Sequence, residues 1–273
     1  MRKRVIKDPA EGDAEAGQLS TSLVRGLDVL RAFRAGDGPL GNQDIIARTG
    51  LPKATVSRIT YTLTALGYLH YDEGLGRYSL GAATVALGYS ALSSSAVVHI
   101  ARPLMQSLAD KTGAAVALGT RDGLEMVYLS NCRSQSPVSL MLDPGSHLPI
   151  WKTAMGLAYA VGLDEQERAE LVARLQSAEP DCAADIAAAF ERAVAVYARL
   201  GYVTSFGAWY PYIRAIGVPF RPADGSAPIA ITCGGIADII SNELTHAQIG
   251  PSLVGLVVSL KAQLEGTSAN QPG

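Results

Sequence analysis

A run of hydrogen-bond donors lies between Pro52 and Gly67, follows helical spacing and contains no acidic side chain. Arginine, serine and threonine can read base edges in a major groove, whereas lysine and tyrosine can hold phosphates. The pattern therefore predicts a helix face that binds double-stranded DNA. The donors on this face are Lys53, Thr55, Ser57, Arg58, Thr60 and Tyr61.

The elements that must position this face are a preceding helix, a turn and a following hairpin. Asn42 is expected to cap the first helix, and Gly50 to end it in a left-handed conformation. The second helix buries one apolar stripe, and a glycine-rich turn joins two short strands after it. Arg77 is expected on this wing, within reach of the DNA backbone. The apolar stripe is Val56, Ile59, Leu63 and Leu66, and the strands are Tyr68 to Tyr71 and Arg77 to Leu80.

Helix pairs joined by a glycine turn also occur in many proteins that do not bind DNA. The absence of acids from the second helix and the hairpin after it favour a winged helix-turn-helix. A preceding helix, with Leu23, Leu27, Leu30 and Phe33 on one face, is expected to support the pair and to be capped by Thr21 or Ser22.

Composition indicates a globular chain with two domains. The 273 residues are 48% hydrophobic and carry a net charge of −2. Residues 1–80 hold 11 Lys and Arg against 9 Asp and Glu, and the remainder holds 12 against 16. Three widely spaced cysteines favour free thiols in a reducing cytoplasm. The absence of a signal-peptide pattern and of a long apolar run predicts a cytoplasmic chain without a membrane partner.

The order of patterns predicts an α+β chain. Its expected parts are a flexible basic arm over 1–19, a winged helix-turn-helix over 20–81, a linker helix over 82–95, an α/β domain over 96–265 and a disordered tail over 266–273. The arm either follows DNA or is simply solvated. The α/β domain is expected to contain strands that include Val138 to Leu142, a helix from Trp151 to Val161, a turn at Pro222 to Gly225 and a closing helix from Asn242 to Leu264.

The sequence contains no catalytic constellation. Its four histidines lack metal-ligand spacing, and there is neither a nucleophile elbow nor a phosphate-binding loop. We therefore expect no enzyme activity, no metal and no cofactor. The start of the Trp151 to Val161 helix presents free amides that could hold a small anion. The second domain is interpreted as a binder.

Several motifs resemble the IclR family of bacterial transcriptional regulators. They are SLVRGLDVLRAF from Ser22, GLPKATVSRITYTLTALGYL from Gly50, GRYSLG from Gly76 and LPIWKTAMGLAYA from Leu148. The resemblance implies a winged helix-turn-helix joined to a GAF-like effector-binding domain. It also implies a homodimer, or a dimer of dimers, on a pseudo-palindromic operator.

The resemblance also implies where a small organic acid effector would bind. In the family, the effector lies between the sheet and the segment that matches Thr153 to Gly156. By position, one wall would be Leu140, Leu148, Ala154 and Met155, and the other Ser205, Ile213, Ala215, Thr232 and Gly234. Each apolar member could equally be ordinary core.

The chain departs from the family pattern after the strand that begins near Gly201. Many relatives carry acids there, whereas this chain has Trp209, Tyr210 and Tyr212. Trp151 also occupies a loop position next to the expected pocket. Aromatic side chains can stack on a ring, which favours a larger, aromatic carboxylate. Alternatively, the three clustered aromatics pack on another subunit.

The combined interpretation is a ligand-responsive repressor of a neighbouring catabolic gene set. An activator of the same architecture, an enzyme with an accessory DNA-binding module and a constitutive DNA binder with a vestigial sensor are the alternatives. The effector, the operator and the sign of regulation are not encoded in any motif.

Overall fold

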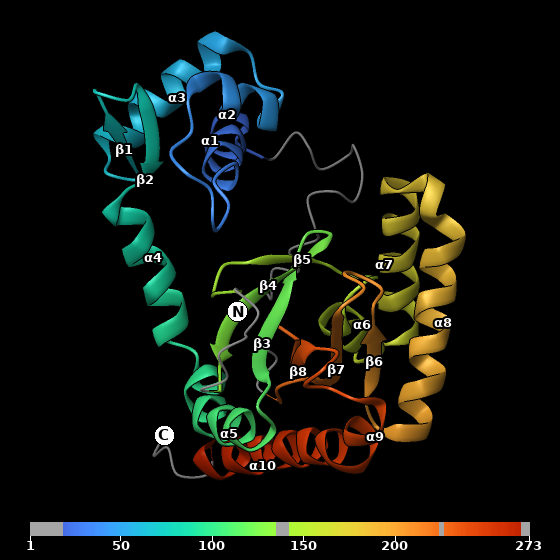
Figure 1. Ribbon diagram of the computed structural model, residues 1–273. Helices are drawn as coiled ribbons and strands as arrows, with labels where there is room; N and C mark the ends of the chain where they lie inside the picture. The colour runs from blue at the N-terminus through green and yellow to red at the C-terminus, as the bar shows by residue number, and fades with distance from the viewer. Residues whose placement is uncertain (1–18, 135–141, 224–226, 269–273) are drawn as a thin grey trace, which may run out of the picture. The chain divides into compact units, whose positions relative to one another are not determined.

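The computed structural model describes residues 19–134, 142–223 and 227–268. The chain divides into two compact units, Met1–Ser90 and Ala91–Gly273, which are described separately (Figure 1). The boundary lies inside α4 (Ala82–Ser93), within the segment expected to be a linker helix. The expected basic arm except Leu19, most of the Val138 to Leu142 strand and part of the turn at Pro222 lie outside the described residues.

The N-terminal unit has the predicted winged helix-turn-helix. Five side chains from different segments form its buried core: Val29, Leu40, Ile45, Val56 and Leu69. The backbones of Leu40 and Tyr78 exchange two hydrogen bonds of 2.8 Å, so the wing is tied to the segment before α2. The elements are α1 (Thr21–Arg31), α2 (Asn42–Thr49), α3 (Lys53–Ala65), β1 (Leu69–Asp72) and β2 (Arg77–Leu80).

The turn between α2 and α3 follows the predicted chemistry, but the start of α2 does not. Gly50 has a φ of 67°, and its N–H donates to the carbonyl of Ile46. The N-cap of α2 is Gly41, and Asn42 is the first helical residue, so the prediction that Asn42 caps this helix was wrong. The carboxylate of Asp44 instead accepts the Gly41 N–H at 2.9 Å.

The N-terminal half of α1 differs from expectation in its packing. Ser20, not Thr21 or Ser22, is the N-cap. Val29 is fully buried, whereas Leu23 and Leu27 are 62% and 49% exposed. The apolar stripe of α1 therefore supports the helix pair only at its C-terminal end.

The C-terminal unit is built on a six-stranded antiparallel sheet in the order β5-β4-β3-β8-β7-β6. Its strands are β3 (Ala115–Asp122), β4 (Glu125–Cys132), β5 (His147–Pro149), β6 (Val203–Phe206), β7 (Ile213–Phe220) and β8 (Ile229–Ile236). Its helical segments are α5 (Ala96–Thr112), α6 (Ala154–Val161), α7 (Glu165–Ala178), η2 (Pro180–Cys182), α8 (Ala183–Leu200), α9 (Asn242–Leu244), η3 (Thr245–Ile249) and α10 (Gly250–Ser268).

The two faces of this sheet belong to separate apolar cores. Helices α5 and α10 pack on each other and on one face, with Met105, Leu118 and Ile231 in that core. Helix α6 packs on the other face, and α8 contacts both α6 and the edge strand β6 (Figure 1). Alternate residues of each strand therefore enter different cores.

Three predicted boundaries in this unit need correction. Helix α6 begins at Ala154, because Trp151 and Lys152 form a turn before it. The short strand β5 was not anticipated. The closing helix contains the π-helical turn η3 and continues to Ser268, so residues 266–268 are helical where a disordered tail was expected.

Within the described ranges, no single helix is long and apolar enough to cross a membrane. Helices α4 and α5 together are long and apolar enough for a membrane span by length and composition alone, but the pair is bent by 78°.

Helix α6 lies unusually close to its neighbours because glycines face it. A Cβ on Gly156 of α6 would lie 2.2 Å from the carbonyl oxygen of Ile150, and one on Gly217 of β7 would lie 2.5 Å from that of Ala154. A Cβ on Gly119 of β3 would meet the sulfur of Met155 at 2.4 Å. A side chain at Gly217 would push α6 away from the sheet, one at Gly156 would push α6 away from the backbone of Ile150, and one at Gly119 would displace Met155.

We expect Gly156→Ala to lower the free energy of unfolding of the C-terminal unit by about 3 kcal/mol, because the added methyl group overlaps backbone atoms. Gly255→Ala is the matched control, since Gly255 also lies in a helix but has open space around it. The control should be neutral or stabilise by about 0.5–1 kcal/mol. Urea unfolding followed by circular dichroism measures both; equal midpoints would contradict the packing argument.

Candidate functional site

The outer face of α3 presents the donors that the sequence predicted for DNA. Lys53, Ser57 and Arg58 are exposed, Tyr61 is 77% exposed and Thr55 is partly exposed. The first turn of α3 contains no acid. This face therefore offers both charged and neutral donors to a polyanion.

Thr60 does not belong to that face. Its side chain is fully buried, and its hydroxyl donates to the carbonyl oxygens of Val56 at 3.0 Å and Ser57 at 3.2 Å. Simple helical spacing placed Thr60 outside, but it lies at the edge of the buried stripe, where a hydroxyl bonded to its own helix is tolerated. We therefore withdraw Thr60 from the predicted DNA contacts.

Two other predicted DNA contacts, Arg77 on the wing and Asn42 on α2, are not free surface donors: Arg77 is already hydrogen-bonded, and the side-chain oxygen of Asn42 is buried. The guanidinium of Arg77 donates to the carbonyl of Pro39 at 2.8 Å and to the carboxylate of Asp44 at 3.1 Å. The Oδ1 atom of Asn42 is buried and has no hydrogen-bond partner among the described residues. The DNA contacts assigned to these two residues stay predictions.

An apolar groove lies on the same unit, between α1 and α3. Leu23, Leu27, Leu66 and Leu87 line it, and each is between 49% and 63% exposed. Contiguous exposed apolar surface of this kind is typical of an interaction site.

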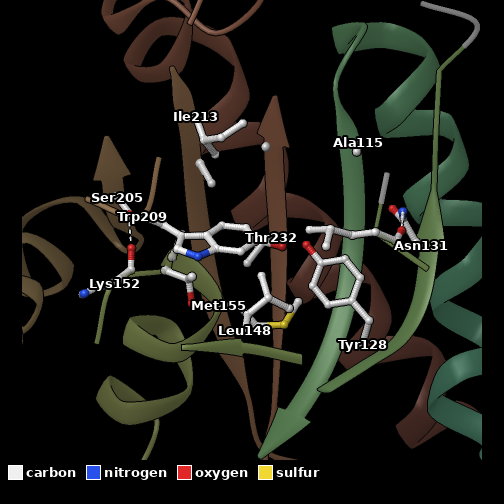
Figure 2. A pocket seen from close by; sticks show the side chains of 15 residues that line it. Ala115, Tyr128, Asn131, Leu148, Lys152, Met155, Ser205, Trp209, Ile213 and Thr232 are labelled. Carbon is white, nitrogen blue, oxygen red and sulfur yellow. Dashed lines mark hydrogen bonds between the residues drawn. The ribbon is translucent and has the colours of Figure 1, made fainter. Parts of the chain in front are cut away.

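A pocket lies in the C-terminal unit, between the sheet and the start of α6 (Figure 2). Eight of the nine wall residues that the family resemblance implied line it, as does Trp209, and the ninth, Leu140, lies outside the described residues. Lys152 and Thr153 come from the start of the expected Trp151 to Val161 helix, and the four other lining residues were not anticipated. The described residues that line it are Ala115, Tyr128, Asn131, Leu142, Leu148, Lys152, Thr153, Ala154, Met155, Ser205, Trp209, Ile213, Ala215, Thr232 and Gly234.

The first turn of α6 closes one side of the pocket. The Thr153 hydroxyl caps the helix by accepting the Gly156 N–H at 3.2 Å, and it donates to the carbonyl of Pro149 at 2.8 Å. Ser205 of β6 donates to the carbonyl of Lys152 at 2.7 Å. The amides of Ala154 and Met155 have no acceptor inside the helix, so this end carries partial positive charge.

The middle of the pocket holds a neutral polar pair. Tyr128 of β4 reaches over the sheet to Thr232 of β8 (Figure 2). Burial raises the pKa of Tyr128 to about 12, and its hydrogen bond with Thr232 opposes that shift. The phenol therefore stays protonated at neutral pH and presents a hydroxyl group, not a charge.

Asn131 lines the pocket because β4 contains a β-bulge, which the sequence did not reveal. The pairing of β3 with β4 shifts between Leu118 and Gly119, which inserts Leu129 as an extra residue in β4. The bulge puts Asn131 on the same face as Tyr128, although strict alternation from Tyr128 would place it on the other face.

The clustered aromatic residues divide between the pocket and the surface. Trp209 lines the pocket and lies 4.6 Å from Tyr210, measured between ring centroids. Tyr210 and Tyr212 are 45% and 58% exposed and do not line it. Trp151 was expected next to the effector, but it lies outside the lining, where its indole N–H donates to Glu179 at 3.2 Å.

The charge of the lining suits an anion. The described residues that line it include no Asp or Glu, and the charged residue among them, Lys152, stacks its ammonium 4.4 Å from the centroid of the Trp151 ring. Within the described part of the chain, no group of three or more His, Cys, Asp or Glu could hold a metal ion.

Comparison with known proteins identifies both units. Residues 22–73 match the family model of the IclR helix-turn-helix domain, and residues 89–250 match that of the bacterial transcriptional regulator IclR C-terminal domain. The HTH-type transcriptional regulator TsaQ1/TsaQ2 of Comamonas testosteroni is 33% identical over 261 residues, which cover 95% of this chain and 94% of that protein.

Solved structures agree with this assignment. An IclR family transcriptional regulator from Brucella abortus is 36% identical with a TM-score of 0.82, over 93% of this chain and 96% of that chain. An IclR homologue from Microbacterium hydrocarbonoxydans, complexed with 4-hydroxybenzoate, shares the fold with a TM-score of 0.70 at 22% identity, over 90% and 100% of the two chains. The present chain therefore belongs to the IclR family of bacterial transcriptional regulators.

Proposed function

We propose that this regulator binds a pseudo-palindromic operator as a homodimer. When a small aromatic carboxylate enters the pocket of the C-terminal unit, the homodimer leaves the operator or changes its arrangement on it. The observation that carries the ligand part is the pocket itself, which joins free helix amides to an aromatic wall and has no acid among its described residues. An anion gains from the amides, and a ring gains from Trp209.

The homodimer is supported by the apolar groove between α1 and α3. Leu23 and Leu27 do not join the core that the described residues of their unit form, yet exposing them to water is unfavourable. Covering them with the same surface of a second copy buries them and places two α3 helices on one DNA duplex. A dimer of dimers through the C-terminal unit is the assembly that the family resemblance implies.

The size of the pocket sets a condition on the ligand. Its cavity volume is about 40 Å³, room for roughly three water molecules, whereas a cavity of about 150 Å³ holds benzene. A ring can enter only if a lining side chain moves. Trp209 is the suitable side chain, because it is half-buried and belongs to the segment between β6 and β7.

The sign of regulation that we propose is repression of a neighbouring catabolic gene set. Regulation requires that the ligand bind one arrangement of the DNA-binding domains more tightly than another. The same architecture activates transcription when its operator lies elsewhere relative to the promoter. Transcription in vitro from the neighbouring promoter, with and without protein, distinguishes the two signs.

The first test is fluorescence anisotropy on DNA from upstream of the gene that encodes the chain. We expect binding that resists competitor DNA and that one member of a panel of aliphatic and aromatic carboxylates shifts. Binding that is equal on unrelated DNA and strongly dependent on salt would reduce the α3 face to a backbone contact. Specific operator binding that no carboxylate changes would contradict only the proposal that a carboxylate controls DNA binding.

We expect Arg58→Ala to weaken operator binding by about 1–3 kcal/mol, if the guanidinium reads a guanine. Titration against the operator and against operators with single substitutions measures the loss. Arg192→Ala is the control, because Arg192 is an exposed arginine on α8 of the other unit. An equal loss on every DNA sequence would make Arg58 a phosphate contact.

We expect Trp209→Ala to reduce affinity for the aromatic carboxylate by about threefold to tenfold, which is the contribution of one aromatic pair. Trp209→Phe should restore part of the loss, since it keeps a ring in the wall. Trp151→Phe serves as control, because Trp151 lies outside the lining. Isothermal titration calorimetry with the full chain gives the affinities, and an unchanged affinity of Trp209→Ala excludes the ligand role.

A further inference from the structure

One residue of the pocket lining, Asn131, has a buried hydrogen-bond acceptor that is unpaired in the described part of the free protein. The Oδ1 atom of Asn131 is inaccessible to water and has no hydrogen-bond partner among the described residues. We propose that Asn131 selects effectors that carry a hydroxyl group on the aromatic ring, on the side away from the carboxylate. This inference rests on the proposed function, and it adds a specificity residue and a narrower ligand class.

The orientation of the Asn131 amide follows from its other bond. Its Nδ2 donates to the carbonyl oxygen of Leu142 at 2.5 Å, an oxygen that also accepts from Arg133 at 2.9 Å. A rotated amide would place two oxygens against each other, so the network assigns Oδ1 to the unpaired position. A buried carbonyl without a donor is unfavourable, and a ligand that brings a donor removes that cost.

The register of the sheet sets the distance from Asn131 to Thr232 in the middle of the pocket. Asn131 pairs with Ala117, and Ala117 pairs with Thr232, so the three lie in one row across β4, β3 and β8. Asn131 and Thr232 are thus two strand spacings apart, roughly 10 Å. Their side chains rise from the same face over the small Ala117. An aromatic ring fits along such a row.

The polarity of the two ends gives the order of the ligand groups. Figure 2 shows Asn131 on one side of Thr232 and Tyr128, and Lys152 and Ser205 on the other. The amides of Ala154 and Met155 are donors and suit the carboxylate, whereas Oδ1 of Asn131 accepts and suits a donor. The donor is a neutral hydroxyl and not an ammonium, since the described part of the lining has no Asp or Glu to balance a cation.

The test compares benzoate, 3-hydroxybenzoate and 4-hydroxybenzoate by calorimetry on the full chain. We expect at least one hydroxybenzoate to bind about tenfold more tightly than benzoate, which corresponds to one satisfied buried hydrogen bond. Asn131→Leu should abolish this preference and leave benzoate affinity unchanged or higher. Binding of benzoate by the variant also shows that its pocket is folded.

Arg133→Met is the matched control. It removes the other hydrogen bond to the Leu142 carbonyl without changing an acceptor in the lining. The preference for the hydroxyl group should survive in this variant. Loss of the preference in Arg133→Met as well would show that the position of Leu142 matters and not the Asn131 oxygen, which overturns the proposal.

Failure of this inference can be separated from failure of the proposed function. If benzoate and the hydroxybenzoates bind equally to the unmodified chain, Asn131 does not select for a hydroxyl group, but the proposal of an aromatic carboxylate effector remains supported. If no aromatic acid binds but an aliphatic acid shifts operator binding, the hydroxyl inference and the aromatic class are both wrong, while ligand control of DNA binding stands. If no acid binds, the ligand part of the proposed function is wrong as well.

Discussion

The C-terminal unit depends on the close contact between α6 and the sheet. Gly156 lies against the backbone of Ile150, and Gly217 lies against the backbone of Ala154. Because no side chain separates the helix from its neighbours, the first turn of α6 and its free amides are held at the edge of the pocket. Thr153 and Ser205 then fix that turn with hydrogen bonds to Pro149 and Lys152. Preorganised donors of this kind bind an anion without reorganisation.

The two units present their chemistry in opposite ways. The N-terminal unit holds exposed donors on one helix, and a small core around Ile45 and Val56 keeps that helix rigid. The C-terminal unit encloses its polar groups, so each unpaired atom matters more there. This difference suits the two partners that we propose, since a polyanion binds at a surface and a small acid is distinguished from its analogues inside a cavity.

The packing of the N-terminal unit also separates residues that look alike in sequence. Arg58 and Arg77 are both exposed arginines, but Arg77 is paired with Asp44, and its charge is partly balanced before any DNA arrives. Thr55 and Thr60 are both threonines of α3, but Thr60 bonds to its own helix. Neither distinction follows from residue type, because each depends on a side chain or a surface contributed by another element.

The sequence by itself determined the local elements and their order. Periodic apolar residues and glycines of positive φ, such as Gly50, specify helices, hairpins and turns through contacts a few residues apart. Family motifs located most of the pocket wall. Only the tertiary structure decided that Asn131 faces the pocket, that Trp209 enters it while Tyr210 and Tyr212 stay outside, and that Leu23 and Leu27 remain exposed. A bulge reverses the alternation of side chains along a strand, and burial depends on segments far away in the sequence. The spacing of neighbouring residues therefore predicts neither the bulge nor the burial.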